Sequence, residues 1–237
     1  MDNAEEFLNL YKSLEEALET RYRERGQGAS SPVSQYLKEK ESEPFRNDLD
    51  LCRQVRNLLS HTADVDGETP VQPANALIRV LQEVLDFVQR PPLAAEYATP
   101  FDALLKAKPD DLVMPVMNKM VERGFSHVPV MRGRLVLGVF SASTPFSQLI
   151  TGCTPAIDEQ TEMSALSNLT RIDQHLTERF LFVPEGISVP EAQRLFTMDK
   201  KREKRLVALF LTTNGQQSGD LVAMMTPWDM TRQRISG

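Results

Sequence analysis

The chain has little cysteine, with two residues among 237. Cys52 and Cys153 are far apart in the sequence, and neither has a partner at the short spacing that metal ligands need. Small disulfide-stabilised proteins are much richer in cysteine. The composition therefore excludes a disulfide framework, and we expect no metal site.

Long hydrophobic runs are also absent. A helix needs roughly 20 mostly apolar residues to cross a bilayer, and no stretch of this sequence approaches that length. Residues 1–6 are acidic and polar, unlike the basic and then apolar start of a secretory signal. We therefore expect no membrane partner and a cytoplasmic location.

A basic excess is missing as well. The formal net charge is −6, whereas proteins that bind nucleic acid without sequence preference usually carry excess positive charge. We therefore expect no DNA partner, and any contact with RNA has to be local.

The first part of the chain has apolar residues at helical spacing. Helices are expected over residues 3–22, 32–40, 45–61 and 74–88, and two consecutive prolines at 91 and 92 end the last one. A chain of this length can form two domains, each with its own core. The sequence thus predicts a helical bundle over residues 1–92 and a second domain over 93–237.

Arg56, Asn57 and His61 lie near the end of the third expected helix. Cleavage of RNA by its own 2′-hydroxyl needs a base, an acid and positive charge near the phosphate, and it can proceed without a cofactor. A guanidinium matches phosphate oxygens, and an imidazole exchanges protons near neutral pH. The five-residue spacing leaves Arg56 and His61 about 140° apart on an ideal helix, so the helix end has to bend.

A structural alternative exists for the same residues. Arginine on a helix is usually a solvated side chain, and histidine near a helix end favours the dipole. The pattern Arg56-Asn57-x3-His61 resembles the signature of the HEPN family of small helical domains. The resemblance implies a metal-independent endoribonuclease with an RNA substrate, and a homodimer, because in that family the site commonly forms where two copies meet. Many members of the family act only as binding modules.

Beyond residue 92, short β-branched runs alternate with helices, which is typical of an α/β unit. A helix over 112–123 precedes strands over 126–131 and 134–141, and a helix over 189–198 precedes strands over 206–212 and 220–226. This order is a degenerate internal repeat. The predicted fold class is therefore α plus α/β.

Two segments of this repeat resemble a tandem pair of CBS domains, which are built from β-α-β-β-α units and commonly bind adenine nucleotides between the repeats. The segments are Ser126-His127-Val128-Pro129-Val130 with Gly138-Val139-Phe140-Ser141, and Ala223-Met224-Met225-Thr226-Pro227-Trp228-Asp229. In that family the strand-to-helix turn reads Gly, two apolar residues, Thr or Ser, two variable residues, and an Asp that contacts ribose. Here Ala223 replaces the glycine of the second repeat, and Thr144 replaces the aspartate of the first.

The resemblance implies one full nucleotide site at most, with Thr226 and Asp229 as its ribose contacts. Ser141 is the matching residue of the first repeat, and Arg205 closes a basic run that begins at residue 200, near the expected phosphates. Helix capping explains Thr226 and Asp229 equally well. We expect His127 to be a core histidine with its hydrogen bonds satisfied, and we see no evident partner for His175 in the sequence. Trp228 is expected either to cover the edge of the domain or to stack on a base.

Two functions follow from these patterns. In the first, a nucleotide-sensing CBS pair regulates a HEPN-like endoribonuclease, with adenine nucleotide as a regulatory ligand. The alternative is a non-enzymatic regulatory or dimerisation protein that binds adenine nucleotides through its CBS pair.

Overall fold

The computed structural model describes residues 3–28, 30–61, 71–152, 156–198 and 204–230, with only the backbone of His61. The chain divides into two compact units, Met1–Pro92 and Leu93–Gly237. Cys153 and most of the basic run before Arg205 lie outside the described residues. Among the described residues, no helix is both long enough and apolar enough to span a membrane.

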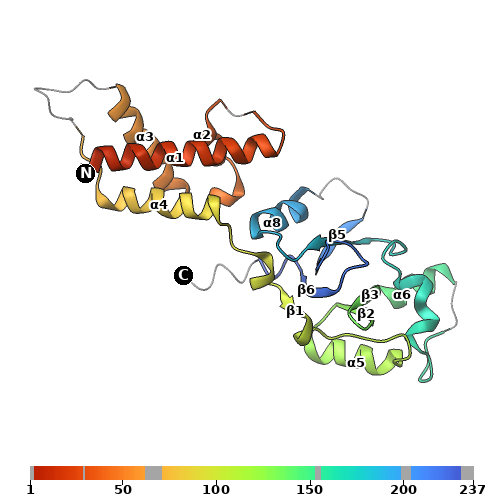
Figure 1. Cartoon of the computed structure of the whole chain (residues 1–237). Coiled ribbons are helices and arrows are strands. Elements are labelled where there is room, and N and C mark those ends of the chain that lie inside the picture. Colours follow the sequence, from red (N-terminus) through yellow and green to blue (C-terminus); the bar gives the residue numbers. More distant parts are fainter. Residues whose placement is uncertain (1–2, 29, 62–70, 153–155, 199–203, 231–237) are drawn as a thin grey trace, which may run out of the picture. The chain divides into compact units, whose positions relative to one another are not determined.

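The first unit is helical, as the sequence predicts (Figure 1). Its helices are α1 (Asn3–Glu24), α2 (Pro32–Tyr36), α3 (Arg46–His61) and α4 (Asn75–Gln89), with a 3-10 turn, η1 (Lys40–Ser42). The apolar stripe of each long helix faces a shared core. That core includes Phe7, Leu14, Leu18 and Tyr22 of α1, Leu49 and Cys52 of α3, and Leu81 and Val84 of α4.

The expectation of one helix over residues 32–40 is wrong in its second half. The helix α2 ends at Tyr36, and the chain then turns through η1. Glu41 of η1 is buried and forms an ion pair with Arg21 of α1. A contact made across 20 positions therefore overrides the local helical pattern, which contains no information about Arg21.

The second unit combines helices with two sheets. Its strands are β1 (Thr99–Pro100), β2 (His127–Arg132), β3 (Leu135–Ser141), β4 (Glu178–Pro184), β5 (Arg205–Thr212) and β6 (Leu221–Met225). Its helices are α5 (Val113–Arg123), α6 (Thr144–Thr151), α7 (Ser167–Thr170) and α8 (Val189–Met198), with 3-10 turns η2 (Ala94–Glu96), η3 (Phe101–Ala103) and η4 (Met163–Leu166).

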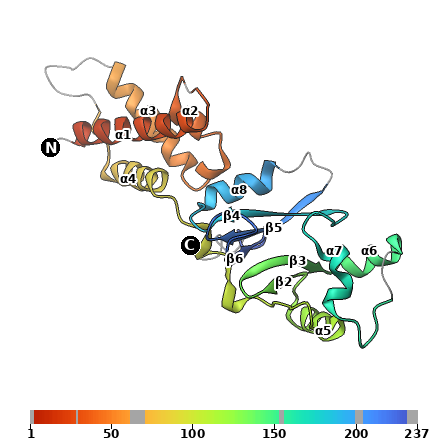
Figure 2. The same cartoon turned by 45° about the vertical axis from the view of Figure 1, so that its right-hand side comes forward.

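The strands form a four-stranded sheet in the order β1-β6-β5-β4 and a separate β2–β3 hairpin (Figure 2). In the four-stranded sheet, β4 and β5 are parallel, and α8 connects them. The hairpin has a related arrangement, because Ala107 bridges Val130 of β2 in parallel and α5 lies between them in sequence. The expected internal repeat is thus present as two helix-plus-strand-pair units.

A shared apolar core joins the two repeats. Val136 and Val139 of β3 pack in one cluster with Phe180 of β4, Phe210 of β5 and Met224 of β6. All five side chains are less than one-tenth exposed. The hairpin therefore cannot move independently of the four-stranded sheet without exposing this cluster, and side chains at the edges of both repeats are held close together.

Candidate functional site

The turn that follows β6 holds the two residues of the predicted ribose contact. The backbone N–H of Thr226 donates to Oδ2 of Asp229 at 2.7 Å, and the Thr226 hydroxyl donates to the same oxygen at 2.8 Å. Asp229 is 6% exposed, whereas its neighbour Trp228 is 77% exposed. Residues 227–230 form a turn, and the residues after them lie outside the described part of the chain.

The matching turn of the first repeat follows β3 and leads into α6. The backbone N–H of Ser141 donates to the hydroxyl oxygen of Thr144 at 3.0 Å. The same hydrogen bond therefore occurs in both turns, from a backbone N–H to the side chain three residues later. The acceptor differs, because a neutral hydroxyl replaces the carboxylate of Asp229.

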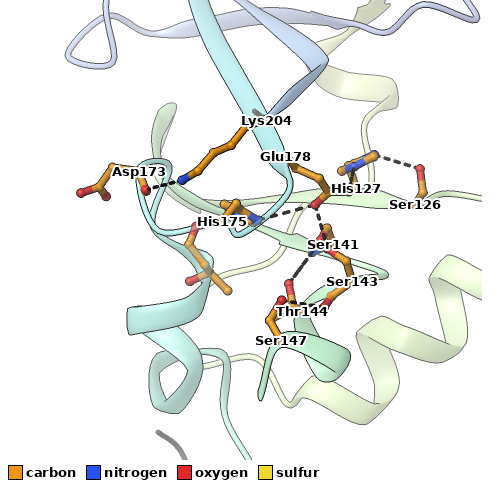
Figure 3. Close-up of polar contacts among 11 residues, drawn as sticks. Ser126, His127, Ser141, Ser143, Thr144, Ser147, Asp173, His175, Glu178 and Lys204 are labelled. Carbon is orange, nitrogen blue, oxygen red and sulfur yellow. Dashed lines mark hydrogen bonds and ion pairs between the residues drawn. The ribbon is translucent and has the colours of Figure 1, made fainter. Parts of the chain in front are cut away.

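A partly buried carboxylate, that of Glu178, lies against the first-repeat turn (Figure 3). Oε1 of Glu178 lies 3.0 Å from Nε2 of His127, and the Ser143 hydroxyl donates to Oε2 at 2.9 Å. The side chains of His127 and Glu178 are 11% and 13% exposed. Ser126 completes the chain of polar contacts, because its hydroxyl lies 2.8 Å from Nδ1 of His127.

His175 faces the same carboxylate from the segment before β4. Its Nδ1 lies 3.6 Å from Oε2 of Glu178, and its Nε2 lies 3.3 Å from the carbonyl oxygen of Thr170. A carbonyl oxygen only accepts, so Nε2 carries the proton in that hydrogen bond. The expectation that His175 has no partner is wrong, because the β4 strand brings Glu178 to it.

The environment of Glu178 favours its charged form. Burial acts to raise the pKa of this carboxyl, but the imidazoles of His127 and His175 and a serine hydroxyl outweigh it and hold the pKa well below its usual range. The two imidazoles face different oxygens of one carboxylate. In the part of the chain that the structure describes, no group of His, Cys, Asp and Glu side chains forms a metal-ligand set.

The four predicted nucleotide contacts lie in two places. Arg205 is the register partner of Glu178 on the neighbouring parallel strand, and Ser141 belongs to the turn that donates to Glu178. Thr226 and Asp229 lie together at the end of β6. Ser141 is fully buried, whereas Thr226 is partly exposed. The assignment of these four residues to a nucleotide stays a prediction.

The predicted ribonuclease residues lie on α3. Arg56 approaches Glu15 of α1 at 3.8 Å, and its guanidinium lies 5.7 Å from the ring centroid of Tyr11. Burial, aided by Glu15, raises the pKa of Tyr11 to about 12. Asn57 is exposed, and the side chain of His61 lies outside the described residues. Arg56 is thus paired within its own unit, and the catalytic role of all three residues stays a prediction.

Sequence reasoning missed Glu178 and His175. The signal that could have found them is weak: two histidines, each close to one of the β-branched runs, and a glutamate at the start of a strand. Another feature without a sequence signal is a hollow of about 440 Å³ beside the β2–β3 turn, lined by Phe101, Met131, Arg132 and residues 106–111. None of the predicted site residues lines this hollow.

Comparisons with known proteins bear on the second unit. No curated protein matches the chain. The structure of CbpB in complex with c-di-AMP is 17% identical with a TM-score of 0.48, over 67% of this chain and 93% of that one. CBSX2 in complex with AMP is 19% identical with a TM-score of 0.42, over 61% and 96%. A hemolysin-like protein containing a CBS domain, from Oenococcus oeni PSU, is 13% identical with a TM-score of 0.42, over 63% and 95%.

The family comparison is more local. It matches residues 89–144, a segment that includes α5, the β2–β3 hairpin and the first-repeat turn. The family whose model matches residues 89–144 is described as the CBS domain.

Proposed function

We propose that residues 93–237 form a regulatory module, a pair of CBS domains, that binds an adenine nucleotide at the turn after β6. The observation that carries this proposal is the carboxylate of Asp229, which the backbone N–H and the hydroxyl of Thr226 hold in the turn directly after the exposed Trp228. CBS domains commonly bind adenine nucleotides, and in the family motif this aspartate contacts the ribose. The nucleotide would therefore bind at Asp229, the motif aspartate that the second repeat retains.

The chemistry of the turn suits a nucleoside. Both hydrogen bonds from Thr226 go to Oδ2 of Asp229. A carboxylate has two acceptor oxygens, and we assign Oδ1 to a ribose hydroxyl. An exposed indole ring offers a flat apolar surface on which a purine base can stack, a contact worth about 1–3 kcal/mol.

Equilibrium dialysis with labelled AMP, ADP and ATP tests this function. We expect saturable binding of at least one nucleotide to the wild type. Asp229→Asn keeps one acceptor for the backbone N–H of Thr226 and removes the charge, so it should fold and bind at least tenfold more weakly. Asp220→Asn is the matched control, because Asp220 is exposed and lies before β6. Equal binding by the wild type and Asp229→Asn would refute the assignment.

For the whole chain we propose that this module controls a HEPN-like endoribonuclease in residues 1–92, with Arg56, Asn57 and His61 in its active site. The sequence pattern supports this proposal, together with the helical character of the unit that carries it. A nucleotide that prefers one conformation of the module would change how two copies of the helical unit meet in a homodimer. Size measurement in solution with and without nucleotide tests the dimer, and metal-free cleavage of an end-labelled RNA tests the activity.

The alternative function is a regulatory protein without catalysis. The pairing of Arg56 with Glu15 and Tyr11 favours it, because a guanidinium engaged within its own unit already has a structural role. Under this alternative, Arg56→Ala and His61→Ala leave the function unchanged, while Asp229→Asn still weakens the response to nucleotide.

A further inference from the structure

We propose that Glu178 is an internal anion that fills an anion cradle at the first-repeat turn, so that each chain binds one nucleotide, at the second-repeat turn only. The cradle consists of His127, Ser143 and His175. The count of nucleotides rests on the proposed function, whereas the cradle itself stands on the geometry of these four side chains.

The cradle gathers polar groups from separate parts of the chain. His127 belongs to β2, Ser143 precedes α6 and His175 precedes β4. His127 and Ser143 lie within hydrogen-bond distance of the two oxygens of Glu178, at 3.0 and 2.9 Å, and Nδ1 of His175 faces one of these oxygens at 3.6 Å. An N–H and an O–H group that converge on one partly buried oxyanion are the arrangement with which proteins hold carboxylate and phosphate. Here the oxyanion comes from the protein.

Glu178 is fixed in this position by its own strand. It is the first residue of β4, in register with Arg205 of β5, and its side chain is 13% exposed. The rings of His127 and His175 both pack edge-on against Phe180 of the same strand. The strand therefore fixes the backbone of Glu178, and Phe180 of the same strand packs against both imidazoles that face its carboxylate.

A charged carboxylate in the cradle repels a second anion. A nucleotide phosphate at this turn would need the same donors, and it would meet the negative charge of Glu178 at close range in a partly buried place. The turn also lacks the ribose contact, because Thr144 stands where the second repeat has Asp229. Both differences favour nucleotide binding at the second-repeat turn alone.

Titration calorimetry of the wild type with AMP and with ATP tests the count. We expect one nucleotide per chain, and binding at least tenfold weaker in Asp229→Asn. Two nucleotides per chain, or one nucleotide that Asp229→Asn binds as tightly as the wild type does, would overturn the inference while leaving nucleotide binding in place. A wild type that binds no nucleotide would refute the proposed function, and the cradle is then decided by the second experiment.

The second experiment removes the internal anion and supplies another. Glu178→Ala empties the cradle, so the unfolding midpoint of this variant should fall by several degrees. Added sodium formate should raise the midpoint again, and by more than sodium chloride does at equal concentration. Wild type and the exposed control Glu185→Ala should respond equally to both salts.

Glu178→Gln separates the cradle from a general effect of lost charge. The amide keeps the size of the side chain and leaves no room for formate, so this variant should be less stable than the wild type and should show no specific response to formate. If Glu178→Ala does not fold without salt, its recovery by formate but not by chloride is the expected result. A response of Glu178→Ala identical in both salts would overturn the cradle.

Discussion

Nε2 of His127 and Oε1 of Glu178 lie 3.0 Å apart, although 51 positions separate the two residues. His127 begins the hairpin strand β2, and Glu178 begins β4 in the four-stranded sheet. The contact therefore joins the two repeats at the edge of their shared apolar core. Changes at this pair are expected to alter both the stability of the second unit and the state of the first-repeat turn.

The first prediction concerns acid stability. The folded-state pKa of Glu178 is lowered from about 4.5, so the carboxylate contributes stability that is fully present above that value and is lost as the pH falls towards the folded-state pKa. We expect the free energy of unfolding to fall as the pH drops below about 4.5, and to keep falling until the pH reaches the folded-state pKa. Urea unfolding at several pH values measures the free energy directly.

Glu178→Gln is the variant that identifies the source of this loss. It should lower the free energy of unfolding at pH 7 by roughly 1–3 kcal/mol, and the difference from the wild type should shrink as the pH falls. Glu185→Gln, at an exposed position, serves as the control. A constant difference between Glu178→Gln and the wild type across this pH range would contradict the prediction.

The second prediction concerns the packing behind the first-repeat turn. A Cβ atom added at Gly138 of β3 would lie 2.3 Å from the carbonyl oxygen of Thr170, which is also the acceptor for His175. Gly138→Ala must therefore shift backbone, and we expect a loss of about 1–3 kcal/mol of folding free energy.

Gly186→Ala is the matched control, because nothing lies within 4 Å of a Cβ atom at Gly186. This variant should stay within about 0.5 kcal/mol of the wild type. If the two substitutions lower the free energy of unfolding in urea equally, the close approach of Thr170 to β3 is not what makes Gly138→Ala destabilising.

The third prediction separates structure from catalysis on α3. Arg56 and Arg53 have equally exposed side chains, 34% each, and each is paired with a carboxylate, Glu15 or Asp50. Ion pairs of this kind contribute about 0–1 kcal/mol, so either arginine should be replaceable by alanine with little loss of stability.

If residues 1–92 cleave RNA, Arg56→Ala should slow cleavage by about 10²–10³-fold, the usual effect of removing one group that stabilises transition-state charge. Arg53→Ala should cleave at the wild-type rate. Equal rates for both variants would assign Arg56 a structural role only, which is the outcome that the non-catalytic alternative expects.

The sequence predicts the long helices and the strands β2, β3, β5 and β6, for physical reasons that are local, but it does not predict α6, α7, β1 or β4. The apolar stripes of α1, α3 and α4 repeat at the helical period, and the Arg132-Gly133 turn between two β-branched runs indicates a hairpin. Two prolines after α4 stop that helix. Such features need no knowledge of distant residues.

Long-range contacts are the part that the sequence does not reveal. A glutamate at the start of a strand usually faces solvent, and nothing near Glu178 in the sequence indicates that His127 and Ser143 will cover it. The same holds for Glu41, whose burial depends on Arg21 of another helix. For the second-repeat turn the pattern was more informative, because the capping contact between Thr226 and Asp229 spans only three positions.

The measurement that tests the central claim most directly uses the fluorescence of Trp228, the one tryptophan in the sequence. Trp228 directly precedes Asp229 and is 77% exposed, so a base that stacks on it should change its emission. We predict a saturable change when AMP or ATP is added to the wild type, and at least a tenfold weaker response in Asp229→Asn. No change with any adenine nucleotide, or the same titration in both proteins, would contradict nucleotide binding at this turn.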